Sequence, residues 1–169
     1  MDVLNQHGYI FHFDKANTAN FYNAYDGICN CAKCRNYYET INDKSPELSQ
    51  FLEQFGIDIA KPIKTWSSFA YNAENLADYV SYYAVNGFFK STEGYEIDFG
   101  AVQIVVNAPN KDDVIHNPEF KTTTEFAEPY FIFTINNLFL PWVVSEDINE
   151  FYPERVTLFN RIKAFFKSR

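Results

Sequence analysis

The sequence predicts a single α+β domain, residues 1–169, with a mostly antiparallel sheet and with helices after the cysteines and at the C-terminus. Segments with the period-two pattern of strands and segments with helical spacing both occur. A length of 169 residues fits one domain, and the chain contains no internal repeat or linker-like stretch. Aromatic residues make up 19% of the chain, so we expect an aromatic-rich core.

The first predicted element is a half-buried strand from Tyr9 to Asp14. Tyr9, Phe11 and Phe13 share one face at period two, whereas His12 and Asp14 point to the other face. His12 and Asp14 have the chemistry of a base and its orienting partner, but no serine or cysteine nucleophile motif accompanies them. We therefore interpret them as a surface pair and expect a protein that is not an enzyme.

A helix is predicted directly after the cysteines, from Ala32 to about Ile41. Cys34, Tyr37, Tyr38 and Ile41 lie at positions i, i+3, i+4 and i+7, which fall on one face of a helix. Because this face is apolar, it packs on the core. The spacing therefore predicts that at least the Cys34 thiol points inward.

A second helix is predicted over residues 46–55. Ser45 is suited to cap this helix, and Pro46 is suited to its first position. Gly56 is a natural C-terminal stop. The apolar stripe at helical spacing consists of Leu48, Phe51, Leu52 and Phe55.

The remaining predicted elements lie in the second half of the chain. They are strands at residues 79–89, 95–106 and 130–140, a loop at 107–118, and helical segments at 146–151 and 156–166. In the strand at 95–106, the period of two predicts one face formed by Ile97, Phe99, Ala101, Gln103 and Val105. The patterns leave residues 65–78 and 107–128 without a definite structure.

The three cysteines of the chain, Cys29, Cys31 and Cys34, lie within six residues and form the main candidate site. A Cys-x-x-Cys pair can bind one metal ion because the intervening turn brings both sulfurs to the same side, and Cys29 adds a third thiolate. The candidate metal is zinc. Common zinc motifs have a second, separated ligand pair, which this sequence lacks. The candidates for a fourth ligand are His7, His12, His116 and Asp26.

Two other interpretations of the cluster stay open. In the first, Cys31 and Cys34 form a redox dithiol at a helix start, where Lys33 and Arg35 would lower a thiol pKa. A thioredoxin-like arrangement would place this dithiol in a βαβ pattern, which the surrounding sequence does not show. In the second, the thiols are reduced and pack like small hydrophobic side chains.

Composition argues against nucleic acid and against a membrane span. The formal net charge of −8 opposes binding to phosphate backbones, and the six glycines form no phosphate-binding loop. No stretch approaches the roughly 18 apolar residues of a span. The basic amphipathic segment at residues 155–169 is interpreted as a helix that docks on the core. The first residues lack the pattern of a secretory signal, so we expect a cytoplasmic location.

Residues 17–62 contain four recognisable elements: Tyr25-Asp26-Gly27, the cluster Cys29 to Cys34, Arg35-Asn36-Tyr37-Tyr38, and the helix end Phe51 to Asp58 followed by Lys61-Pro62. In this order, the elements resemble those of a group of small bacterial proteins of Firmicutes type. A later element, Leu140-Pro141-Trp142-Val143-Val144, resembles an apolar Pro-Trp segment of the same group. The resemblance implies a bacterial cytoplasmic protein and says little about its chemistry.

The sequence favours a non-enzymatic protein that binds another protein, in a regulatory or immunity-like role. Its acidity suits a basic partner, and its 12 tyrosines include candidates for a recognition surface. The alternative is a metal-binding or thiol-redox protein that uses Cys29, Cys31 and Cys34.

Overall fold

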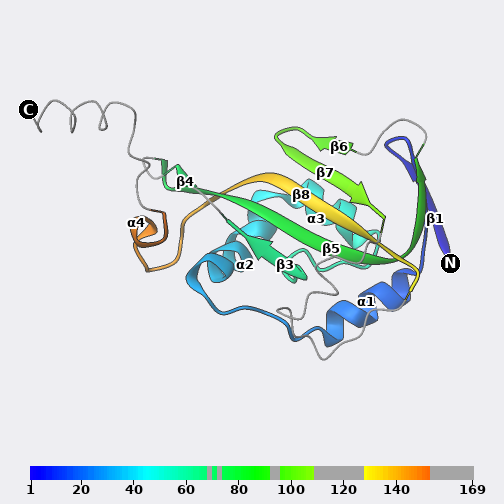
Figure 1. Cartoon of the computed structure of the whole chain (residues 1–169), viewed down its shortest axis with the longest axis horizontal. Helices are drawn as coiled ribbons and strands as arrows, with labels where there is room; N and C mark the ends of the chain where they lie inside the picture. Colours follow the sequence, from blue (N-terminus) through cyan, green and yellow to red (C-terminus); the bar gives the residue numbers. More distant parts are fainter. Residues whose placement is uncertain (68–69, 72–73, 92–95, 109–127, 153–169) are drawn as a thin grey trace, which may run out of the picture.

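The computed structural model describes residues 1–67, 70–71, 74–91, 96–108 and 128–152. In this part of the chain, eight strands form one antiparallel sheet in the order β1-β2-β5-β8-β7-β6, with β3 and β4 also pairing with β5 (Figure 1). The strands are β1 (Asp2–Gln6), β2 (Tyr9–Phe13), β3 (Lys64–Trp66), β4 (Ala70–Tyr71), β5 (Leu76–Ser91), β6 (Glu96–Phe99), β7 (Val102–Asn107) and β8 (Tyr130–Pro141). The architecture confirms the predicted α+β fold.

The helices are α1 (Lys15–Ala24), α2 (Ala32–Lys44), α3 (Pro46–Glu53) and α4 (Ile148–Phe151). The Tyr37 ring of α2 lies 5.5 Å from the Tyr79 ring of β5, measured between centroids. The Phe55 ring, just after α3, lies 5.0 Å from the Phe133 ring of β8. Tyr83, four residues from Tyr79 on β5, is the register partner of Phe133, so these side chains share one face. Helices α2 and α3 therefore cover the same face of the sheet.

The core between these helices and the sheet is aromatic, as expected. Phe11 of β2 lies 5.1 Å from Phe55 and 5.6 Å from Phe131 of β8. Each such side chain stabilises the fold by roughly 1.5–3 kcal/mol when fully buried. The predicted inward residues of the first strand and of the 46–55 helix are all buried: Tyr9, Phe11, Phe13, Leu48, Phe51, Leu52 and Phe55. Ser45 occupies the predicted cap position, although its side chain makes no capping hydrogen bond.

Helix α1, which the sequence did not predict, covers a gap along one edge of β5. Strands β2 and β3 pair with different parts of this edge and leave the residues between them without a strand. The Tyr22 hydroxyl accepts the Ala84 N–H at 2.9 Å and donates to the Ala84 carbonyl at 3.1 Å. The Thr18 hydroxyl accepts the Asn86 N–H at 3.1 Å. Because buried backbone groups need partners, α1 substitutes for the missing strand.

The prediction of one strand at residues 95–106 is wrong, because the chain turns at Gly100 and forms β6 and β7. Gly100 has φ of +65°, a left-handed conformation that favours glycine, and Phe99 pairs with Val102 across the turn. The turn also changes which side chains face the core. Ile97, Ile104 and Val106 are buried, whereas Ala101, Gln103 and Val105 are exposed or half-buried.

The described chain ends shortly after α4. The Asp147 side chain accepts the Asn149 N–H at 2.9 Å and caps this short helix, which lies within the predicted helical segment 146–151. The predicted helix at 156–166 and most of the predicted loop at 107–118 lie outside the described residues. Among the helices of the described part, none has the length and apolar character needed to cross a membrane.

Candidate functional site

The three cysteines converge at the start of helix α2. Their Sγ atoms all lie within 4.8 Å of one another. Cys29 and Cys31 are exposed, whereas Cys34 is buried, as its position on the apolar helix face predicted. The Cys31 N–H donates to the Cys29 Sγ at 3.5 Å, which turns the Cys29 side chain back toward the helix. The cluster therefore has two accessible sulfurs and one sulfur fixed in the core.

The local backbone explains this convergence. Cys31 is the N-cap residue of α2 and has an extended conformation, with φ of −73° and ψ of 159°. The first turn follows directly, as the Arg35 N–H donates to the Cys31 carbonyl at 2.9 Å. Cys34 lies three residues after the cap, so the first turn brings its side chain back beneath Cys31. The Cys-x-x-Cys spacing thus places two sulfurs on one side of the helix start.

The loop that carries Cys29 is held by Arg35. Its Nη1 donates to the Asn30 carbonyl at 2.7 Å, and its Nη2 forms an ion pair with the Glu146 carboxylate. Glu146 lies just before α4, so one side chain connects the cysteine loop to the C-terminal part of the described chain. The hydrogen bond to the Asn30 carbonyl fixes the backbone between Cys29 and Cys31.

Asn36 fixes the start of α2 to the sheet, and sequence reasoning did not identify it as a site residue. Its side chain is fully buried and makes three hydrogen bonds. The Nδ2 donates to the Tyr79 hydroxyl at 3.1 Å and to the Pro141 carbonyl at 3.0 Å, and the Oδ1 accepts the Val143 N–H at 2.7 Å. These partners belong to β5, to the last residue of β8 and to the chain just after it. The cysteines therefore project from a helix end whose position is determined by buried contacts.

Lys33 is the second cation beside the cluster. Its Nζ donates to the Ser67 carbonyl at 3.1 Å and lies 4.3 Å from the centroid of the Tyr152 ring. Its own carbonyl accepts the Tyr79 hydroxyl at 3.0 Å. Lys33, like Arg35, therefore attaches the helix start to its surroundings.

The environment at the start of α2 lowers the pKa of Cys31 and raises the pKa of Cys34. Burial raises the pKa of Cys31, but the Cys34 N–H, the Cys29 and Cys34 side chains and the Lys33 N–H outweigh it, so the pKa is lowered. The pKa of Cys34 is raised, first by burial and then by hydrogen bonding to Cys31 and its charge. Cys31 therefore loses its proton before Cys34 does.

Tyr38 is half-buried on α2, one helical turn after Cys34. The pKa of its phenol is raised, first by burial, then by the charge of Cys34 and by a hydrogen-bonding interaction with the Cys34 side chain. A neutral phenol beside a sulfur can donate its proton to a thiolate and stabilise it. Tyr38 is thus placed to support Cys34 in its charged form.

The candidate fourth ligands do not join the three sulfurs in the described residues. The group of metal-ligating side chains found there contains Cys29, Cys31 and Cys34 and none of the described candidates. The His7 ring packs 5.9 Å from Phe51 and 5.5 Å from Phe99, and the His12 ring stacks 4.7 Å from Phe88. His7 and His12 occupy other parts of the sheet, Asp26 stays outside the group, and His116 lies outside the described residues.

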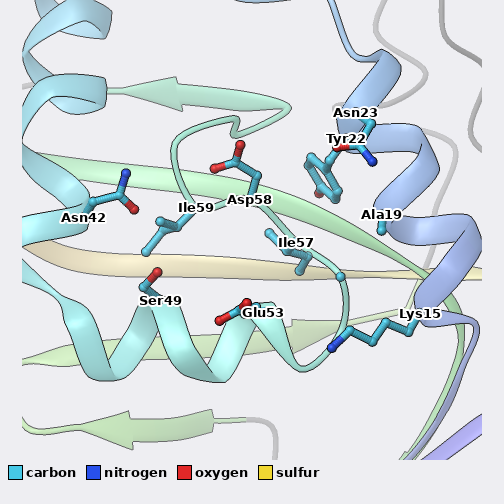
Figure 2. Close-up of a pocket in the computed structure, with 11 residues that line it drawn as sticks. Lys15, Ala19, Tyr22, Asn23, Asn42, Ser49, Glu53, Ile57, Asp58 and Ile59 are labelled. Atoms are coloured by element: carbon cyan, nitrogen blue, oxygen red, sulfur yellow. The ribbon is translucent and has the colours of Figure 1, made fainter.

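A cleft of about 390 Å³ lies near the opposite end of α2, between α1, α3 and the chain that follows α3 (Figure 2). Its polar lining includes Lys15, Asn42, Glu53 and Asp58, and all four side chains are exposed. Asn42 lies 11 residues after Cys31, or about 16 Å along the helix axis. The cleft is therefore separate from the thiol site, and its charged groups are solvated.

The fold and the site define an α+β protein with a surface cluster of three thiols. Comparison of the chain with protein-family models, with curated proteins and with solved structures found no match. The resemblance of residues 17–62 to a bacterial group stays a prediction.

Proposed function

We propose that this protein binds a thiophilic metal ion, foremost zinc, through Cys29, Cys31 and Cys34. The observation that carries the proposal is the convergence of the three sulfurs to within 4.8 Å of one another. With a Zn–S bond of about 2.3 Å and tetrahedral angles, ligand sulfurs lie about 3.8 Å apart. Binding therefore requires the sulfurs to approach one another by at most about 1 Å, which the exposed Cys29 and Cys31 can supply.

The surroundings of the sulfurs also suit a metal. Zinc binding removes the thiol protons, and the lowered pKa of Cys31 favours loss of the first proton. The Tyr38 phenol can donate to the Cys34 thiolate, and hydrogen bonds of this kind orient ligands and tune affinity. Because Cys29 and Cys31 are exposed, a water molecule or another outside ligand would complete the tetrahedron.

Elemental analysis of protein purified without chelator, and after reconstitution with zinc, tests the proposal. We expect about one equivalent of zinc, and a rise in Tm of roughly 5–10 °C at zinc concentrations a hundredfold above Kd. The variants C29S, C31S and C34S should each weaken binding, whereas H7A and H12A serve as controls and should retain it. Less than about a tenth of an equivalent after reconstitution would refute a structural metal site.

A second candidate function is recognition of a protein with a basic surface. Trp66, Tyr71 and Phe139 are 47%, 48% and 40% exposed. Their register partners on β5 are Val80, Leu76 and Asp78, which share the face opposite the helices. Exposed aromatic side chains are typical of protein interfaces, and the net charge of −8 favours a basic partner.

Affinity capture with variants tests this second candidate. W66S and F139S should each lose a partner that wild-type protein recovers, and the loss should be greater at high salt if charge contributes. V3S, on the exposed edge strand, provides the control and should recover the partner. If W66S and V3S recover the same proteins as wild type, the aromatic face has no such role.

A further inference from the structure

We propose that Cys31 is a peroxide-sensitive thiol that forms a disulfide with Cys34, and that this disulfide releases the metal from the three-thiol site. The release of metal rests on the proposed function, whereas formation of the disulfide does not. Oxidation of the cluster by a hydroperoxide would thus control how many thiolates remain available to bind the metal.

The geometry favours this pair of cysteines. The Cys31 and Cys34 sulfurs lie within 4.8 Å of each other across the first turn of α2. A disulfide needs a separation of about 2.05 Å, and the exposed Cys31 side chain can rotate toward the fixed Cys34. Cys29 and Cys31 have only one residue between them, which makes a disulfide between these two strained.

Exposure determines which sulfur meets the oxidant first. Cys31 is exposed at the N-cap of a 13-residue helix, whereas Cys34 is only 7% exposed. A hydroperoxide therefore reaches Cys31 and leaves Cys34 as the second thiol. Cys29 is also exposed, and its sulfur lies within 4.8 Å of the other two, but Asn30 and the N-cap residue Cys31 separate it from the first turn of the helix.

The reaction balances with hydrogen peroxide as the oxidant. The Cys31 sulfur attacks one peroxide oxygen, the O–O bond breaks, and sulfenic acid and one water form. The Cys34 sulfur then attacks the Cys31 sulfur and displaces hydroxide, which leaves as a second water with the Cys34 proton. Two thiols lose two electrons and peroxide gains them. Cys29 remains as the single thiolate, which is too few to hold the metal.

Tryptic mapping of metal-free protein treated with one equivalent of peroxide tests the disulfide. Trypsin cleaves after Lys33 and Arg35, so a Cys31–Cys34 bond joins the dipeptide Cys34-Arg35 to the peptide of residues 16–33. The intact protein should lose the mass of two hydrogen atoms. C29S is the matched variant that removes the competing sulfur, and it should still give the same linked peptides.

C31S should slow formation of the linked peptides by at least about tenfold, because Cys34 is buried and Cys29 lacks the helix-turn geometry. C34A should give Cys31 sulfenic acid without linked peptides. Failure of C29S to form the linked peptides, or a bond confined to residues 16–33, would overturn the assignment of Cys31 and Cys34.

Zinc-loaded protein with a metallochromic indicator then tests release. We expect zinc to appear in solution at the rate at which the linked peptides form. Zinc that stays bound after the disulfide has formed would overturn the release. A protein that takes up zinc but forms no disulfide would overturn this inference and leave the proposed function standing. A protein that forms the disulfide but never takes up zinc would refute the proposed function and the release, but support the oxidation step.

Discussion

The two ends of helix α2 carry polar side chains in opposite settings. At the start of the helix, Asn36 is fully buried and makes three hydrogen bonds beneath the thiol cluster. At the other end, Asn42 is exposed in the cleft beside Glu53 and Asp58, which are also exposed. Buried polar groups with satisfied partners fix a position, whereas exposed ones exchange their partners with water. The comparison explains why we assign chemistry to the thiol site and none to the cleft.

The largest expected effect is the difference in the free energy of unfolding between variants of Asn36 and Asn42. N36A leaves the Pro141 carbonyl and the Val143 N–H without their side-chain partner, and we expect it to lower the free energy of unfolding by about 3 kcal/mol. N42A is the matched control on the same helix and should change it by less than about 0.5 kcal/mol. Urea denaturation measures both. If the two variants lowered the free energy of unfolding by similar amounts, the proposed contrast between the two ends of α2 would be wrong.

The cysteine variants should have the next largest effect. Replacing any one of Cys29, Cys31 and Cys34 by serine removes one of three ligands, and we expect zinc affinity to fall by about a hundredfold or more. S49A in the cleft should bind zinc as wild type does. Competition titration with a chelator of known affinity measures this difference. A hundredfold loss of zinc affinity in S49A would place the metal site in the cleft and not at the cysteines.

In metal-free protein, Cys31 and Cys34 should be alkylated at different rates, and these rates should depend on pH. A lowered pKa gives Cys31 more thiolate at pH 7, whereas the raised pKa of Cys34 keeps that thiol protonated. We expect iodoacetamide to modify Cys31 at least about tenfold faster than Cys34. The Cys31 rate should fall as the pH is lowered through its pKa. Peptide mapping at a series of pH values measures both rates, and equal rates at every pH would contradict the assigned environments.

Tyr38 should have an intermediate effect on metal affinity. Y38F removes the hydroxyl beside Cys34 and keeps the ring, so we expect zinc affinity to fall by about tenfold with little change in Tm. Y71F, on the opposite face of the sheet, is the control. An unchanged affinity in Y38F would show that the phenol does not support the Cys34 thiolate.

The smallest effect is expected for the Arg35–Glu146 ion pair. Both side chains are about one-third exposed, so water screens their attraction. E146Q should leave Tm close to that of wild type and change zinc affinity by no more than about twofold. E53Q provides the matched control in the cleft. A large loss of zinc affinity in E146Q would mean that the position of the cysteine loop depends on this ion pair and not only on the hydrogen bond from Arg35 to the Asn30 carbonyl.

Much of the fold was predictable from local periodicity. On the predicted face of α2, Cys34, Tyr37 and Ile41 are buried and Tyr38 is half-buried, and the stripe of α3 is buried as well. Such patterns are readable because the burial of each residue follows from its spacing to near neighbours. The same reasoning placed the three cysteines together, since they lie within six residues and one helical turn separates two of them.

The rest depends on contacts that sequence spacing does not encode. Asn36 binds residues that are 43, 105 and 107 positions away, so no local pattern indicates its role. Helix α1 was missed because its inward side chains include Tyr22 and Thr18, which hydrogen-bond to the backbone at the edge of β5 and do not form an apolar stripe. Edge strand β1 was missed because its side chains are largely exposed. The turn between β6 and β7 had a readable signal in Gly100, which the strand prediction overlooked.

X-ray absorption at the zinc K-edge of the reconstituted protein tests the central claim most directly. The account predicts three sulfur ligands at about 2.3 Å and one oxygen or nitrogen ligand at about 2.0–2.2 Å. C34S should show one sulfur fewer. A spectrum of wild-type protein without sulfur ligands, or with one sulfur and several nitrogens, would contradict a metal site built from Cys29, Cys31 and Cys34.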